Sequence, residues 1–176
     1  MKKTHLVYLV RAALSAALIF LGIYIIKIPI PVGYIHFGDG FIYATAALLP
    51  PVYAAAAAAV GGFLSDLLAG YGMYAPWTAV IKALMAIPVT LLCRNNGFIA
   101  RLRGAADRFE KRDLLPVLLS VVVSGVINVG GYFLADSTLF DTAAAAASLP
   151  LNAVQSVAGI IIFFLAVPLV AKAFKK

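Results

Sequence analysis

Long apolar runs without alternation constrain this chain of 176 residues more than any other feature of its sequence. Hydrophobic residues account for 64% of the chain and charged residues for 12%, whereas a soluble domain of this size carries far more charge. Such a chain requires lipid as its solvent, and in lipid only helices and closed barrels satisfy the backbone hydrogen bonds. Because the runs are long and lack a period of two residues, we predict an all-α integral membrane bundle.

The apolar runs predict six transmembrane helices in one domain that covers residues 1–176. The helices are expected over residues 5–26, 36–50, 52–68, 77–93, 114–135 and 149–170, of which the second is short for a span of about 20 residues. Two prolines and a glycine predict an extended loop over residues 27–34, and residues 136–147 predict a loop with or without a short helix. Residues 94–113 predict either an amphipathic helix on the membrane surface or a solvated linker.

Positive charges concentrate at one side of the predicted bundle. Residues 94–113 hold six Lys and Arg residues, and further cations lie near both termini. Because cytoplasmic loops of membrane proteins are enriched in Lys and Arg, we predict that both termini and this loop are cytoplasmic. Four aspartates fall toward the outer side: Asp39, Asp66, Asp136 and Asp141.

The sequence offers little for catalysis or metal binding. Its two histidines, His5 and His36, lie far apart, whereas metal sites need closer or more numerous ligands. No serine motif accompanies His36, and the basic residues are not interleaved with aromatic ones. We therefore expect no enzyme activity, no metal or cofactor, and no nucleic-acid partner.

Polar and aromatic residues at the outer ends of the predicted helices indicate a binding pocket. If the second and third segments form an antiparallel pair, the polar residues near positions 36–39, 66–77 and 82 meet at one face of the membrane. The candidate substrate-binding residues are Tyr34, His36, Asp39, Asp66, Tyr74, Trp77, Lys82, Asn128, Tyr132, Asn152 and Gln155.

Several of these candidates have a structural alternative. Asp39 follows a glycine at a helix start, and we favour a helix-capping role for it over ligand contact. Tyr74 and Trp77 are candidates for interfacial anchors. Asn152 and Gln155 lie three residues apart on one helix face, where the amides bond either another helix or a ligand.

Lys82 lies inside an apolar segment and needs acceptors. A lysine at the centre of a membrane helix costs about 2.5–3.5 kcal/mol on insertion scales, so it is expected to face the bundle interior. Asp66 is the first candidate partner and Asp39 the second. Three roles remain open for Lys82: ligand contact, an ion pair that holds helices together, and a side chain that reaches out to the lipid headgroups.

The first helix carries small residues that permit close helix packing in lipid. These residues are Ala12, Ala13, Ala16 and Ala17. They form either an internal packing surface or a docking face for a partner subunit, and the sequence favours neither.

Taken in order, several short motifs resemble those of the substrate-binding (S) component of an energy-coupling factor (ECF) transporter, in the branch for riboflavin and related ring vitamins. The motifs are residues 11–17, Ile28-Pro29-Ile30-Pro31, His36-Phe37-Gly38-Asp39, Ser65-Asp66-Leu67-Leu68-Ala69-Gly70-Tyr71, Ala75-Pro76 with Lys82, and Asn152-Ala153-Val154-Gln155. The resemblance implies six helices in the plasma membrane of a prokaryote and a vitamin-sized pocket near the outer face.

The same resemblance implies partners for the chain. These are a transmembrane coupling subunit, which the four alanines would contact, and two ATP-binding subunits. The sequence has no glycine-rich phosphate loop of its own with which to energise transport. Riboflavin, pyridoxine, a hydroxymethylpyrimidine precursor and pantothenate remain open as substrates, and Lys82 favours an anionic or acceptor-rich ligand over a cation such as thiamine. The alternatives are a membrane-embedded structural or assembly protein and an intramembrane enzyme.

Overall fold

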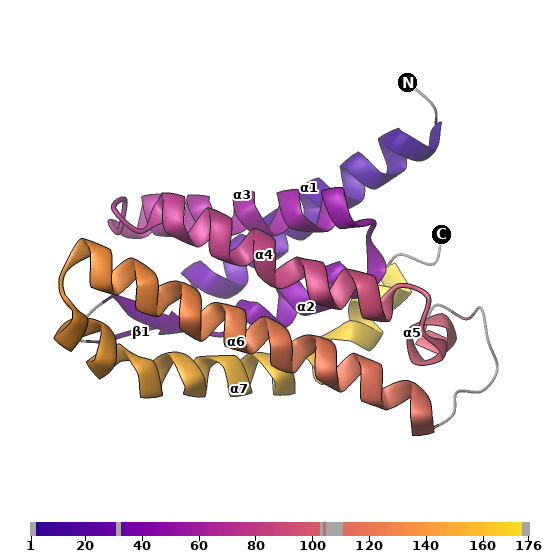
Figure 1. Cartoon of the computed structure of the whole chain (residues 1–176). Coiled ribbons are helices and arrows are strands. Elements are labelled where there is room, and N and C mark those ends of the chain that lie inside the picture. Colours follow the sequence, from indigo (N-terminus) through magenta and orange to yellow (C-terminus); the bar gives the residue numbers. More distant parts are fainter. Residues whose placement is uncertain (1–2, 31–32, 103, 105–110, 174–176) are drawn as a thin grey trace.

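The computed structural model describes residues 3–30, 33–102, 104 and 111–173. Within these residues the chain forms seven α-helices, one short 3₁₀ helix and a two-stranded hairpin (Figure 1). The elements are α1 (Lys3–Tyr24), β1 (Lys27–Pro29), β2 (Tyr34–His36), α2 (Asp39–Leu48), α3 (Pro51–Ala69), α4 (Ala75–Cys93), α5 (Gly97–Leu102), η1 (Lys111–Asp113), α6 (Leu114–Leu139) and α7 (Thr142–Ala173). The predicted all-α membrane bundle is confirmed, and the predicted extended loop forms the antiparallel hairpin β1–β2.

Five of the described helices are long and apolar enough to cross a membrane: α1, α3, α4, α6 and α7. Helix α2 has only 10 residues and extends about 15 Å, half of the hydrocarbon core of about 30 Å. The predicted count of six complete spans is therefore not confirmed. The first turn of α1 and the last turn of α7 nevertheless lie at the same end of the bundle, opposite the hairpin (Figure 1).

Helix α2 lies at the centre of the bundle. All of its residues except Phe41 are buried, and it packs against α7, α4 and α1. Two glycines permit close backbone contact with α7: a Cβ atom at Gly159 would lie 2.8 Å from the Cβ atom of Asp39, and one at Gly40 would lie 2.9 Å from the carbonyl oxygen of Gly159. This contact holds Asp39, the first residue of α2, in the interior.

The small residues of α1 divide between two faces. Ala12 is buried and Ala16 is half-buried, and a Cβ atom at Gly61 of α3 would lie 2.8 Å from the carbonyl oxygen of Ala16. Ala13 and Ala17 are exposed. Ala12 and Ala16 therefore serve the packing of α1 on α3, and Ala13 and Ala17 remain available to a partner.

The prediction of a loop over residues 136–147 is wrong. Helix α6 continues to Leu139 and α7 already begins at Thr142. A run of alanines follows Thr142, and alanine has the highest helix propensity of any residue type. Asp141 caps the start of this helix, because its side chain accepts a hydrogen bond from the amide of Ala144 at 2.7 Å. The run therefore begins the last helix.

The polar stretch at residues 94–113 contains the short helix α5, whose Ile99 is buried. Phe98 packs edge-on against Phe164 of α7, with ring centroids 6.3 Å apart. The described part of the stretch is thus attached to the bundle. The amphipathic helix predicted here falls partly on residues 103 and 105–110, which lie outside the described residues.

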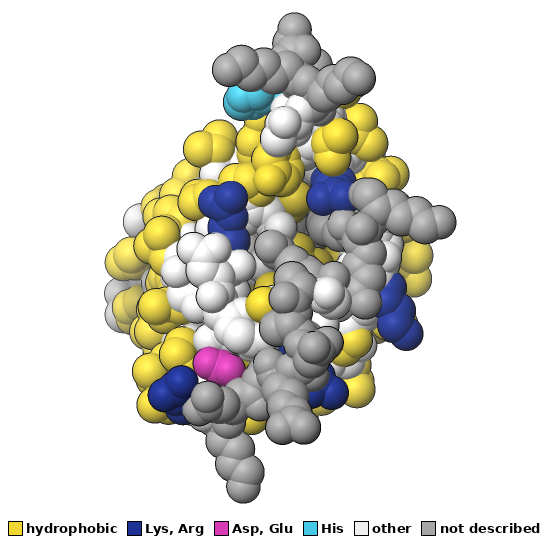
Figure 2. Space-filling model, turned by 90° about the vertical axis from the view of Figure 1, so that its right-hand side faces the viewer, with side chains coloured by type: hydrophobic (Ala, Val, Ile, Leu, Met, Phe, Trp, Pro, Cys, Tyr) yellow, Lys and Arg dark blue, Asp and Glu magenta, His cyan; other side chains and the backbone are white. Residues whose placement is uncertain are grey.

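Lys and Arg side chains gather at the end of the bundle that holds α5, while apolar side chains cover the flanks (Figure 2). Arg94 follows the end of α4, Arg101 lies in the last turn of α5, and Lys172 lies in the last turn of α7. This grouping agrees with the positive-inside rule, and the cytoplasmic orientation of this end remains a prediction.

Candidate functional site

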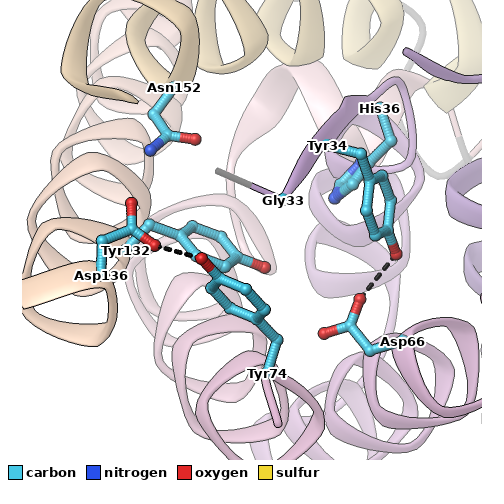
Figure 3. A pocket seen from close by; sticks show the side chains of 8 residues that line it. All are labelled: Gly33, Tyr34, His36, Asp66, Tyr74, Tyr132, Asp136 and Asn152. Atoms are coloured by element: carbon cyan, nitrogen blue, oxygen red, sulfur yellow. Dashed lines mark hydrogen bonds between the residues drawn. The ribbon is translucent and has the colours of Figure 1, made fainter. Parts of the chain in front are cut away.

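A small polar pocket lies at the opposite end of the bundle, beneath the hairpin (Figure 3). Its lining residues come from β2 and the residue before it, the end of α3, the residue that caps the start of α4, and the facing sides of α6 and α7. The lining residues are Gly33, Tyr34, His36, Asp66, Tyr74, Tyr132, Asp136 and Asn152. The pocket thus joins side chains that are far apart in the sequence, as ligand sites between helices commonly do.

Two tyrosine–aspartate pairs form opposite walls of this pocket (Figure 3). The hydroxyl of Tyr34 donates to Oδ1 of Asp66 at 2.6 Å, and the hydroxyl of Tyr74 donates to Oδ1 of Asp136 at 2.6 Å. Burial and the neighbouring Asp66 raise the pKa of Tyr34, so its hydroxyl stays protonated and can donate. Asp66 lies in the last turn of α3, which ends in the left-handed Gly70.

Aromatic rings narrow the pocket. The ring of Tyr74 lies 6.4 Å from that of Tyr132, and the ring of Tyr34 lies 4.9 Å from that of Tyr71, between centroids. The enclosed volume is about 20 Å³, which accommodates a single water molecule. A larger ligand therefore requires the lining side chains to separate.

A charged network lies directly behind the pocket. Nζ of Lys82 donates to Oδ1 of Asp39 at 2.7 Å and to Oδ1 of Asn128 at 2.8 Å, and the Lys82 and Asp39 side chains are both 0% exposed. Nε2 of Gln155 donates to Oδ2 of Asp39 at 2.9 Å. Nζ of Lys82 also lies 5.0 Å from the ring centroid of Tyr132, which separates it from the pocket.

This network corrects two predictions. The ion-pair partner of Lys82 is Asp39 and not Asp66, because α2 occupies the centre of the bundle beside α4. Gly38 and not Asp39 takes the N-cap position of α2, and among the described residues the carboxylate of Asp39 is bonded to Lys82 and Gln155. Lys82 does not reach the headgroups either, because its side chain is fully buried.

Gln155 links the network to the hairpin. Its Oε1 accepts the backbone amide of His36 at 3.1 Å, while its Nε2 binds Asp39. The Nδ1 atom of His36 in turn accepts the amide of Gly38 at 3.2 Å. Burial lowers the pKa of His36 to about 3, so the ring is neutral at physiological pH and can accept this bond.

A family model described as "ECF-type riboflavin transporter, S component" matches residues 3–175. The chain belongs to this family. It is also 31% identical, over 140 residues, to an uncharacterized protein of Pyrococcus woesei described as lying in the gap 3' region. That match covers 78% of this chain and 84% of the relative.

As a member of this family, the chain is the substrate-binding subunit of a vitamin-uptake system. It takes a small-molecule substrate, associates with an ECF module and lies in the plasma membrane as a multi-pass protein. S components are transporter subunits and not a class of enzyme.

The predicted site residues of the S component divide into three groups. The pocket lining contains Tyr34, His36, Asp66, Tyr74, Tyr132 and Asn152. The network behind it contains Asp39, Lys82, Asn128 and Gln155. Trp77 is half-buried against the hydrophobic core, outside both.

Two lining residues were missed by the sequence-based prediction, Gly33 and Asp136. Asp136 was assigned to a loop, although it lies four residues after Tyr132 on the same apolar helix. A lone acidic residue within a membrane helix is itself a signal for a functional site, and it could have identified Asp136.

Proposed function

We propose that this S component binds a water-soluble ring vitamin or vitamin precursor in the pocket beneath the hairpin, and presents it to the ECF module for uptake. The observation that carries this proposal is the convergence of polar and aromatic side chains from five elements on one buried point. A few placed polar groups among aromatic rings suit a ligand that is flat and polar.

The groove between α6 and α7 is a less suitable site for such a ligand. Its residues are Val122, Gly125, Val126, Val129, Gly130, Ala153, Ser156, Val157 and Ile160. This lining is almost wholly apolar and gives a water-soluble vitamin no groups to orient it. In a membrane, lipid chains fill such a surface.

Binding requires the pocket to widen. Drug-sized ligands occupy sites of roughly 300–1,000 Å³, far more than the enclosed 20 Å³. Tyr34 and Tyr74 are each held by a single hydrogen bond to an aspartate, so their rings can move apart around the ligand. The aspartates and Asn152 then orient the ring.

Calorimetric titration of the purified protein with riboflavin, pyridoxine, hydroxymethylpyrimidine and pantothenate tests this function. We expect saturable binding of one of the four, with riboflavin the first candidate because the family is described by it. A folded protein that binds none of them would favour the structural or assembly role over vitamin capture. Turnover of a titrated compound would instead favour the intramembrane enzyme.

We further propose that the S component delivers the vitamin through a transmembrane coupling subunit that is driven by two ATP-binding subunits. The exposed face of α1 suits the coupling subunit, because Val10, Ala13, Leu14, Ala17 and Leu21 share one exposed face at helical spacing. Small residues on such a face let a partner helix approach closely.

Replacing Ala17 by tryptophan is expected to abolish vitamin uptake by cells while vitamin binding by the isolated S component stays unchanged. The bulky ring would protrude from the exposed face of α1 and block the partner helix. Uptake of radiolabelled vitamin and titration of the purified protein measure the two effects. Leu165→Trp is the control, because Leu165 is 70% exposed on α7. If cells with the Ala17→Trp variant take up the vitamin as well as cells with the Leu165→Trp control, this docking face is excluded.

A further inference from the structure

Asp66 carries a buried acceptor that the protein itself does not use. Its Oδ1 accepts the Tyr34 hydroxyl, whereas its Oδ2 has no hydrogen-bond partner among the described residues. The residue is 4% exposed, and Figure 3 shows this second oxygen turned toward the space beside Tyr74 and Tyr132. Buried carboxylate oxygens are rarely left unpaired, because their desolvation is then uncompensated. A group that enters the pocket would supply the missing donor.

The tyrosine hydroxyls in the rest of the lining are already engaged in hydrogen bonds. The Tyr74 hydroxyl is bound to Asp136, whose second oxygen accepts the hydroxyl of Ser148. The hydroxyls of Tyr132 and Thr78 bond each other at 2.9 Å, and either of them can be the donor. The Thr78 hydroxyl also lies near the Asp66 carboxylate, but it makes no hydrogen bond to Oδ2 that meets the distance and angle for one.

The remaining donors in the lining are Nε2–H of His36, whose Nδ1 accepts the amide of Gly38, and the amide of Asn152. Oδ2 of Asp66 is the buried acceptor left for a donor group of the ligand.

The charges around the pocket are also negative on balance. Asp66 and Asp136 form no ion pair with any described residue, while the nearby Lys82 is neutralised by Asp39. His36 is neutral because burial lowers its pKa to about 3. An anionic ligand would meet two carboxylates in a poorly solvated site, where like charges repel strongly.

We propose that the vitamin presents a hydrogen-bond donor, such as an amino, ring N–H or hydroxyl group, to Oδ2 of Asp66, and that it carries no net negative charge. This inference rests on the proposed function and deepens it. It admits riboflavin, pyridoxine and hydroxymethylpyrimidine, disfavours pantothenate, and brings the cation thiamine back into consideration. It reverses the preference for an anionic ligand that the sequence had indicated from Lys82, since Lys82 is already paired.

Titration of the full-length protein in lipid nanodiscs with these five compounds tests the inference. In the unmodified protein, we expect a neutral or cationic compound to bind and pantothenate to bind at least tenfold more weakly. In the Asp66→Asn variant, the compound that binds should bind about 10- to 100-fold more weakly, because the amide NH2 group that takes the place of Oδ2 is a donor and cannot accept a hydrogen bond from the ligand. Tyr34 can still donate to the amide oxygen, so the melting temperature should stay close to that of the unmodified protein.

The control is Asp141→Asn. Asp141 is an exposed carboxylate at the start of α7, and asparagine caps a helix as well as aspartate does. Its affinity for the same compound should be unchanged. Tightest binding by pantothenate, or undiminished binding by Asp66→Asn, would overturn this inference and leave the proposed function standing. Failure of all five compounds to bind would reject the proposed function and the inference together.

Discussion

The Lys82→Met variant is expected to lose about 3–5 kcal/mol of its free energy of unfolding. Methionine is unbranched like lysine and only one atom shorter, but it removes the charge that faces Asp39 at 2.7 Å. The carboxylate of Asp39 would then remain buried with Gln155 as its hydrogen-bond partner, and Asn128 would lose the donor at its Oδ1. An uncompensated buried charge is among the largest single destabilisations known for a point substitution.

Thermal or chemical unfolding of the detergent-purified protein measures this loss. The double variant Lys82→Met with Asp39→Asn is the control, because it removes both charges and should recover most of the stability. A single variant as stable as the unmodified protein would contradict the structural role. If affinity for the vitamin fell while stability did not, Lys82 would contact the ligand instead.

The Gly159→Ala variant is the second for which we expect a large effect. Its methyl group would lie 2.8 Å from the Cβ atom of Asp39 and 3.5 Å from the ring of Tyr43, so α2 and α7 must move apart. Overpacking of this kind costs about 1–3 kcal/mol. Since the movement also separates Gln155 from Asp39, we expect vitamin binding to weaken along with stability.

Gly130→Ala is the matched control for this variant. A Cβ atom at Gly130 meets nothing within 4 Å, and Gly130 lies inside helix α6. The same substitution should therefore be neutral or stabilise the protein by about 1 kcal/mol through helix propensity. Equal melting temperatures for the two variants would show that α2 and α7 are not held together by backbone contact.

The helices were predictable because each apolar run has to satisfy its own backbone in lipid. The residues at which the helices begin and end were less predictable, as residues 136–147 show. Polar residues there suggested a loop, whereas the helix propensity of the alanines and the cap at Asp141 extend the helices from both sides. The central place of α2 was not predictable, since it depends on close packing at Gly40 and Gly159 and not on any periodic pattern.

Most of the candidate site could be identified as polar residues in an apolar chain, but the sequence did not show which of them face the ligand. Lys82 is an example, because its partner depends on which helix lies beside α4 in space. Ala12 and Ala13 are another, since the rotation of α1 against α3 buries the first and exposes the second. Sequence spacing gives neither of these relations.

The most direct test of the proposed vitamin site is a crystal structure of this S component grown with the vitamin that binds in the titrations. We predict density for the vitamin ring between Tyr34, Tyr74 and Tyr132, with a donor group of the ligand within hydrogen-bond distance of Oδ2 of Asp66, and with the Lys82–Asp39 pair unchanged behind it. Density for the vitamin in the apolar groove between α6 and α7, or at the end of the bundle that holds α5, would contradict the proposed site beneath the hairpin.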